Sequence, residues 1–258
     1  QKYKLSPEKF QEAMLSLEFH FVCTLGYRKK DDRWHEVVTL FHEWKEHLSF
    51  LKETQPPSVP DSKKVARYRP ADFAFVDDLT AVLNHAKKQP GFLKQKNVSI
   101  KFSSPLPDEE YLKRLIFKIE SVHLAKLQNG DLILTEAGNE WLELRSENRA
   151  LYLYRLPANE RMIREIEKSI IRIVNAGWVT LPDFLKSVCV PISEGQSITL
   201  KKTGKNWKYQ RPTYTPEDLK TIEKVVFEHL FETGLIVLGS YQGNPCISVT
   251  PLGQSLFG

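Results

Sequence analysis

The sequence predicts a mainly α chain with small β-hairpins, an α+β fold class in which one arrangement of elements occurs twice. Three observations support this prediction. A helix start at Thr215–Pro216 is followed by the pattern of an apolar hairpin, and the same order of signals occurs about 115 positions earlier. Elsewhere, apolar residues recur at steps of three and four, which is the spacing of helices with one buried face.

The later segment begins with a well-defined helix start. Thr215 supplies an N-cap hydroxyl, Pro216 occupies the first helical position, and two carboxylates follow in the positively poled first turn. An apolar stripe then continues to Gly234, which supplies a left-handed stop. The members of this stripe are Leu219, Ile222, Val226, Phe227 and Leu230.

A hairpin and a closing helix are expected after this stop. Apolar runs at 235–238 and 246–249 flank the turn residues 242–245, which is the pattern of two paired strands. Thr250–Pro251 then repeats the capping signal before the last short helix.

The earlier segment carries the same signals in the same order. Asp108 caps a helix, Asn129–Gly130 turns a hairpin, and Thr135 and Gly138 correspond to Thr250 and Gly253. The helix has an apolar stripe of Tyr111, Leu112, Leu115, Ile116, Ile119 and Leu124. Each segment therefore has the pattern of the second half of a winged helix, and we expect tandem winged helix-turn-helix domains.

Helical spacing also predicts the other elements. Ser6–Pro7 starts a first helix that runs to Leu25, and a second helix is expected from Trp34 to Phe50. Further helices are expected over 72–86 and 160–175.

The predicted domains divide near residue 150. Residues 1–150 hold an N-terminal helical region and the first winged-helix domain, with a linker-like, proline-rich loop at 55–70. Residues 151–258 form the second winged-helix domain, and its basic insertion at 191–214 is expected to form a hairpin.

Composition sets the outer limits. The chain has 258 residues, of which 41% are hydrophobic, enough for two domains of ordinary size. No run approaches the ~18 apolar residues of a membrane span, and no secretory leader is recognisable. We therefore expect a cytoplasmic chain without membrane contact. Because the sequence begins with Gln rather than Met, we also expect a fragment of a larger protein.

No motif for catalysis or cofactor binding occurs. The sequence contains no CxxC, GxGxxG, GxxxxGK[ST] or GxSxG pattern. His42 and His47 flank a glutamate, but a spacing of five places them about 140° apart around a helix, so they cannot share one ion. Three scattered cysteines fit neither a disulfide framework nor a structural zinc site. We expect no catalytic residue, no cofactor, no metal and no enzymatic activity.

Basic residues cluster along a chain whose net charge is +5. Runs of lysine beside aromatic residues combine charge that attracts phosphate with rings that stack on bases. We predict DNA binding, with single and double strands both left open. The predicted residues are Lys201, Lys202, Lys205, Trp207, Lys208 and Arg211 of the insertion, Lys87, Lys88, Lys94 and Lys96, and Lys113, Arg114 and Lys118 of the helix after Asp108.

The helix after Thr215 favours a different function. Its Lys220 and Lys224 are outnumbered by Glu217, Asp218, Glu223, Glu228 and Glu232. Because an acidic helix is repelled by phosphates, the alternative is a winged-helix module that docks another protein without direct DNA binding.

Two sequences, LTEAGNEWLELRSENRALYLYR and FETGLIVLGSYQGNPCISVTPLGQSLF, resemble the winged-helix regions associated with bacterial XPB-like helicases. The resemblance covers roughly half the chain, and the loop at 55–70 and the insertion at 191–214 have no counterpart in it. It implies an accessory module of a larger machine, facing DNA or protein, with the motor elsewhere.

Overall fold

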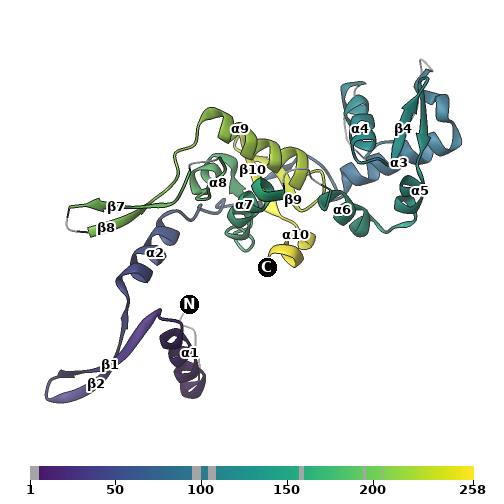
Figure 1. Ribbon diagram of the computed structural model, residues 1–258. Coiled ribbons are helices and arrows are strands. Elements are labelled where there is room, and N and C mark those ends of the chain that lie inside the picture. Colours follow the sequence, from purple (N-terminus) through teal and green to yellow (C-terminus); the bar gives the residue numbers. More distant parts are fainter. Residues whose placement is uncertain (1–5, 95–99, 104–108, 157–159, 194–195, 205) are drawn as a thin grey trace. The chain divides into compact units, whose positions relative to one another are not determined.

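The computed structural model describes residues 6–94, 100–103, 109–156, 160–193, 196–204 and 206–258 (Figure 1). The chain divides into two compact units. Unit 1 comprises residues 1–55 and 198–211, and unit 2 comprises residues 56–197 and 212–258. This division differs from the predicted boundary near 150. The central part of the basic insertion groups with the N-terminal region, because its second strand packs on a helix of that region.

Unit 1 contains two helices and two hairpins. Its first helix starts as predicted, because the Ser6 hydroxyl accepts a hydrogen bond from the backbone N–H of Lys9. Among the described residues of this unit only Cys23 and Phe50 are buried. The elements are α1 (Pro7–Phe19), β1 (Cys23–Lys30), β2 (Arg33–Leu40), α2 (His42–Glu53), β7 (Thr199–Thr203) and β8 (Asn206–Gln210).

The helix predicted from Trp34 to Phe50 is wrong over its first half, because residues 23–40 form the antiparallel hairpin β1–β2. Asp31 and Asp32 have φ of +50° and +57°, and positive φ at both central residues is the geometry of the tight turns that connect twisted strands. β-Branched residues in the second strand further favour an extended backbone. The first helix also ends earlier than predicted, at Phe19.

The first core of unit 2 is enclosed by five helical segments and one hairpin. Trp141, Phe75 and Phe92 are among its largest buried side chains. The predicted Asn129–Gly130 turn is confirmed, with φ of +52° and +82°. The elements are α3 (Ala74–Lys88), the 3₁₀ helix η2 (Pro90–Lys94), α4 (Glu109–Ser121), β4 (Ala125–Gln128), β5 (Asp131–Leu134), α5 (Glu136–Glu143) and α6 (Ser146–Tyr154). The predicted cap Asp108 lies outside the described residues.

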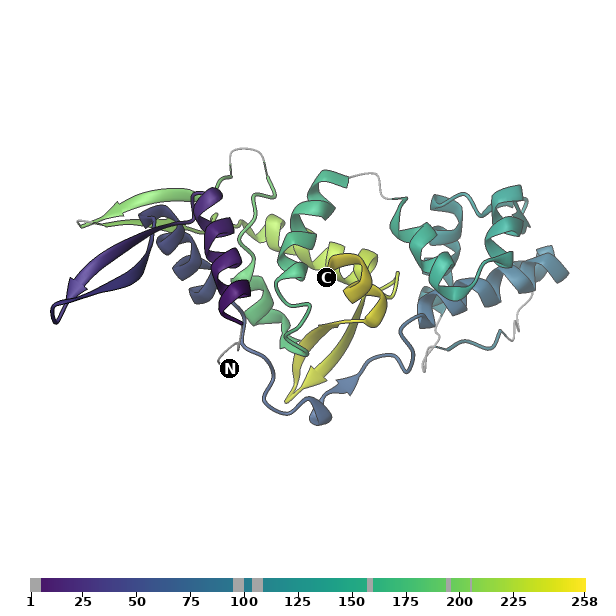
Figure 2. The same cartoon turned by 90° about the horizontal axis from the view of Figure 1, so that it is seen from below.

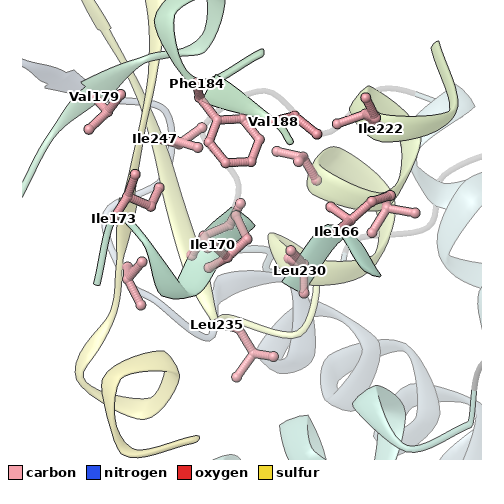
Figure 3. Close-up of a cluster of buried hydrophobic side chains, with 14 of the residues drawn as sticks. Ile166, Ile170, Ile173, Val179, Phe184, Val188, Ile222, Leu230, Leu235 and Ile247 are labelled. Atoms are coloured by element: carbon pink, nitrogen blue, oxygen red, sulfur yellow. The ribbon is translucent and has the colours of Figure 1, made fainter. Parts of the chain in front are cut away.

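The second core of unit 2 lies between helices and a four-stranded antiparallel sheet. Isoleucines of α7 converge on Phe184 and Leu230 (Figure 3). The predicted Thr215 cap is confirmed, and Asp218 completes a capping box with it. The elements are α7 (Glu160–Ile171), β6 (Val179–Thr180), α8 (Leu181–Ser187), α9 (Pro216–Lys224), the π-helix η3 (Val225–Leu230), β9 (Ile236–Tyr241), β10 (Asn244–Val249) and α10 (Pro251–Phe257). Figure 2 gives a second view of these elements.

The segment predicted as a linker contributes to this sheet. After the 3₁₀ helix η1 (Ser62–Lys64), the short strand β3 (Ala66–Arg67) pairs with β9, and the strand order is β3-β9-β10-β6. Nearby, the N–H of Val59 donates to the Trp178 carbonyl at 2.7 Å. The prolines that suggested a linker lie outside β3, so none of them interrupts its pairing with β9.

The two closing helices of unit 2 begin with the same contact. The Thr135 hydroxyl donates to the His123 carbonyl at 2.7 Å, and the Thr250 hydroxyl donates to the Gly234 carbonyl at 2.7 Å. Both acceptor residues have left-handed φ, +58° and +71°, where the preceding helix stops. The internal repeat read from the sequence therefore extends to equivalent hydrogen bonds.

The glycines of this repeat are required by close backbone approach. A Cβ on Gly138 would lie 1.9 Å from the Leu124 carbonyl oxygen, and one on Gly253 would lie 2.2 Å from that of Leu235. Each closing helix thus rests directly on the backbone that leads into the preceding hairpin.

A buried histidine lies where the helix after Thr215 widens into η3. The His229 ring stacks on Tyr154 at 5.4 Å, and the Tyr154 hydroxyl donates to Glu167 at 2.6 Å. Burial lowers the pKa of His229 to about 4, and the positive charge of Lys118 acts in the same direction. In the described part of the chain, no helix is long and apolar enough to cross a bilayer.

Replacing Gly138 or Gly253 with alanine is expected to lower the free energy of unfolding by at least about 2 kcal/mol, because the carbonyl that meets the new methyl is held in the fold. Urea unfolding followed by circular dichroism measures this change. Gly26→Ala is the control, since a Cβ there meets nothing within 4 Å, and its effect should stay within about 0.5 kcal/mol. Equal effects of all three substitutions would contradict the close approach.

The buried His229 should make unit 2 less stable in mild acid. Its pKa is below the ordinary 6.5 in the folded state, so the unfolded chain binds a proton first as pH falls. As the pH is lowered from 6.5 to about 4, the free energy of unfolding should decrease by about 3 kcal/mol in all. Urea unfolding at several pH values should show a shallower dependence for His229→Leu than for wild type. Parallel dependences would refute this assignment.

Candidate nucleic-acid interface

The basic insertion forms the hairpin that the sequence predicts. β7 and β8 pair antiparallel around a turn that contains Gly204 at φ +65°. Lys201 is directly opposite Lys208, and Lys202 is opposite Trp207; all four side chains are exposed. Like charges directly opposite each other on paired strands repel. An anion bound beside them would relieve this repulsion.

The base of this hairpin is anchored on α2. The Tyr209 ring contacts His47 at 5.6 Å and Phe50 at 5.9 Å between centroids. Trp207, two residues nearer the turn, is 49% exposed. One aromatic side chain of β8 therefore holds the hairpin in place while another remains available to solvent.

Most cations of the hairpin are free of acidic partners. Lys201, Lys202, Lys208 and Arg211 make no ion pair within 4 Å with any residue that the structure describes. Lys208 also lines a small hollow with the carboxylates of α2, which balance part of its charge. The predicted Lys205 lies outside the described residues.

The hairpin β1–β2 has similar chemistry, and sequence reasoning missed it. Arg28 pairs in register with His35, and Lys30 pairs with Arg33, so these four exposed residues share one face. The other positions on this face are Thr24, Gly26, Val37 and Thr39, so it carries no acidic residue.

Aromatic side chains stand on the opposite face of β1–β2. Tyr27 is 71% exposed and Trp34 is 68% exposed. On that face Lys29 forms an ion pair with Asp32 at 2.7 Å. The signal that would have revealed the hairpin is the pair of aspartates at 31 and 32, since Asp tolerates the left-handed backbone that a tight turn requires.

Several predicted cations of unit 2 have local partners. Lys94 pairs with Asp131 at 2.6 Å, and Lys113 pairs with Glu109 one helical turn away at 2.7 Å. Lys87 and Lys88 are exposed at the end of α3. Lys96 lies outside the described residues. Among the described residues, the predicted cations of this unit are therefore more often neutralised than those of unit 1.

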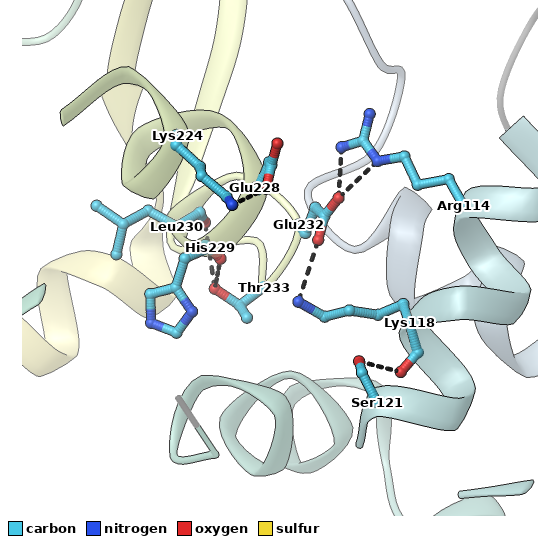
Figure 4. A network of polar contacts seen from close by, with 9 residues as sticks. All are labelled: Arg114, Lys118, Ser121, Lys224, Glu228, His229, Leu230, Glu232 and Thr233. Atoms are coloured by element: carbon cyan, nitrogen blue, oxygen red, sulfur yellow. Dashed lines mark hydrogen bonds and ion pairs between the residues drawn. The ribbon is translucent and has the colours of Figure 1, made fainter. Parts of the chain in front are cut away.

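Arg114 and Lys118 both bind one buried carboxylate (Figure 4). Both nitrogens of an Arg114 fork donate to Glu232, one of them at 3.0 Å, and Lys118 lies 3.3 Å from the other oxygen. Glu232 is only 3% exposed. These two cations of α4, predicted to meet DNA, thus serve an internal ion cluster.

An arginine from the segment that was predicted as a linker, Arg69, joins this cluster. The Arg69 guanidinium lies 4.5 Å from the centre of the Phe231 ring and 5.8 Å from that of Tyr111. Burial lowers the pKa of Arg69, partly offset by Tyr111 and by the negative charge of Glu232. The Arg69 side chain therefore packs against the rings of Tyr111 and Phe231.

Comparison of the chain with protein-family models, curated proteins and solved structures finds no match. Within the described ranges, no group of three or more His, Cys, Asp or Glu side chains could hold a metal ion.

Glu232→Gln is expected to lower the free energy of unfolding by about 1–3 kcal/mol, because Arg114 and Lys118 would lose the charge that compensates them. Their partial exposure keeps the loss below that of a fully buried pair. Glu228→Gln is the matched control, since its 3.9 Å contact with Lys224 is exposed and should contribute less than about 0.5 kcal/mol. Equal effects in urea unfolding would show that the buried cluster is not stabilising.

Proposed function

We propose that this chain is a non-enzymatic nucleic-acid-binding module of a larger protein. Its main contact surface comprises the basic residues of the two hairpins of unit 1. The observation that carries the proposal is a set of exposed cations with no ion-pair partner among the described residues, on two hairpins that also carry exposed aromatic rings. These cations are Arg28, Lys30, Arg33, Lys201, Lys202, Lys208 and Arg211.

The chemistry of these hairpins favours single strands. Lysine and arginine attract the phosphate backbone regardless of sequence. Exposed rings such as Trp34 and Trp207 can stack on unpaired bases, which a duplex keeps covered. A surface of this kind binds single-stranded DNA with little sequence preference.

Unit 2 fits a pair of winged helices, and this arrangement is part of the proposal. Support comes from the repeated order of helix, hairpin and closing helix, and from the equivalent contacts of Thr135 and Thr250. Because Arg114 and Lys118 are paired with Glu232, we leave them out of the proposed interface. Lys87 and Lys88 remain candidates for a secondary contact.

Protein docking is the second candidate function, and the exposed apolar residues of α1 favour it. Phe10 and Leu15 are each 52% exposed, and Phe19 is 80% exposed. The acidic character of the helix after Thr215 is weaker support than the sequence suggested, because Asp218 and Glu232 are buried in internal contacts.

Fluorescence polarisation with a labelled 20-nucleotide single strand and the matching duplex tests the main proposal. We expect salt-sensitive binding that favours the single strand. Lys201→Glu with Lys208→Glu should weaken it at least about tenfold and reduce its salt dependence. Arg28→Glu with Lys30→Glu should act in the same direction.

The control for these variants is Lys45→Glu with Lys52→Glu, which makes the same change of charge on exposed positions of α2. It should change affinity less than about threefold, because these lysines lie outside the hairpins. Equal losses in the hairpin and control variants would show a general charge effect. Absence of binding to both oligonucleotides at low salt would refute the proposal and favour docking.

A further inference from the structure

An aromatic hollow in unit 1 lies beside the basic hairpin β7–β8. It has a volume of about 320 Å³ and opens between α2 and β8. Its lining residues are Glu43, Trp44 and His47 of the helix and Tyr209 of the strand. The proposed contact with nucleic acid uses none of these four residues.

The local structure explains why these rings meet. Trp44 and His47 are three positions apart and therefore lie on neighbouring parts of the same helix face. The position of Tyr209 on β8 brings its ring to the same place, where the strand packs on α2. The hollow is thus built by a helix and a hairpin that are far apart in sequence.

The rings stand at steep angles to one another. Trp44 and His47 have an interplanar angle of 82° with centroids 5.9 Å apart, and His47 and Tyr209 have an angle of 73° at 5.6 Å. In an edge-to-face contact, the ring that presents its edge keeps its own faces uncovered by that partner. Trp44 is 39% exposed, so its ring is accessible from solvent.

The charge around the hollow is negative. Glu43 lines it and makes no ion pair within 4 Å with a described residue. The adjoining hollow of about 170 Å³ adds Glu46 and Glu53, against one cation, Lys208. Three carboxylates therefore lie along this side of α2, and they outnumber the single cation that lines the two hollows.

Aromatic faces and a carboxylate together select a particular ligand chemistry. The face of an aromatic ring carries partial negative charge and attracts cations, most strongly for tryptophan. An alkylated ammonium group has little hydration to lose and presents apolar methyl groups to the rings. We propose that the hollow formed by Glu43, Trp44, His47 and Tyr209 binds a quaternary ammonium group.

Two sources offer this chemistry, a free small molecule and a trimethylated lysine side chain of a partner protein. Choline and a short peptide with one trimethyllysine represent them. ¹H NMR titration follows the methyl resonance of each ligand. Binding over ring faces should move this resonance upfield. Tighter binding of the peptide would identify a protein partner, and tighter binding of choline a small molecule.

A neutral ligand of the same shape separates cation recognition from simple apolar contact. In 3,3-dimethylbutan-1-ol, a carbon atom replaces the nitrogen of choline. We expect it to bind at least about tenfold more weakly than choline, since it lacks the charge that the ring faces attract. Equal binding of the two would overturn the proposal, as would the absence of binding by both choline and the peptide.

Substitutions locate the site. Trp44→Ala should weaken binding at least about tenfold, Trp44→Phe should retain part of it, and Glu43→Gln should weaken it about threefold or more. Trp207→Ala is the matched control, since this exposed tryptophan of the same unit does not line the hollow. It should leave choline binding unchanged while weakening the binding of single-stranded DNA. Loss of choline binding in Trp207→Ala but not in Trp44→Ala would place the site elsewhere and refute the assignment.

The two proposals can fail separately. Charge reversal at Lys201 should weaken DNA binding without abolishing choline binding. Trp44→Ala should weaken choline binding and leave DNA binding in place. Circular dichroism of each variant shows whether the fold is retained. A folded Trp44→Ala variant with undiminished choline binding would overturn the ammonium site and leave the DNA proposal standing.

Discussion

Glu232 provides the constraint on which the arrangement of unit 2 depends. Burying a carboxylate until it is 3% exposed is costly unless cations replace the water that it has lost. Arg114 and Lys118 of α4 supply those cations, so a helix of the first core is tied to the chain that leads into the second hairpin. The same contact changes the functional argument. Two cations that give α4 the composition of a DNA-binding helix are occupied within the protein. Of the predicted cations that the structure describes, those without an ion pair lie mainly on the hairpin β7–β8 of unit 1.

Within each core of unit 2, a short-range contact determines where the closing helix begins. A threonine hydroxyl binds the carbonyl at the end of the preceding helix, and a glycine three residues later allows two backbone segments to touch. A side chain at Gly138 or Gly253 would fill the space that a carbonyl oxygen occupies. These residue types occur twice because the same close approach occurs twice, which is why the repeat was visible in the sequence.

Unit 1 follows a different principle, because few of its side chains are buried. Its aromatic rings therefore act at the surface, and the residues beside them decide what they can attract. Next to Lys202, the exposed Trp207 is suited to a base on a phosphate backbone. Next to Glu43, the ring of Trp44 is suited to a cation. In our proposals, the same type of side chain serves opposite charges at two places in one unit.

The sequence by itself determined the elements whose signals are local. The caps at Thr215 and Thr250, the Asn129–Gly130 turn and the hairpin between Lys201 and Lys208 required only neighbouring residues, and the structure confirms each of them. Helical spacing predicted a helix over residues 34–40, where the structure has a strand. Apolar residues in a short strand can also fall at steps of three and four. Only the tertiary structure paired Glu232 with residues more than 100 positions away and brought Tyr209 against α2. Such contacts depend on how separate elements pack, and no local pattern in the chain records that packing.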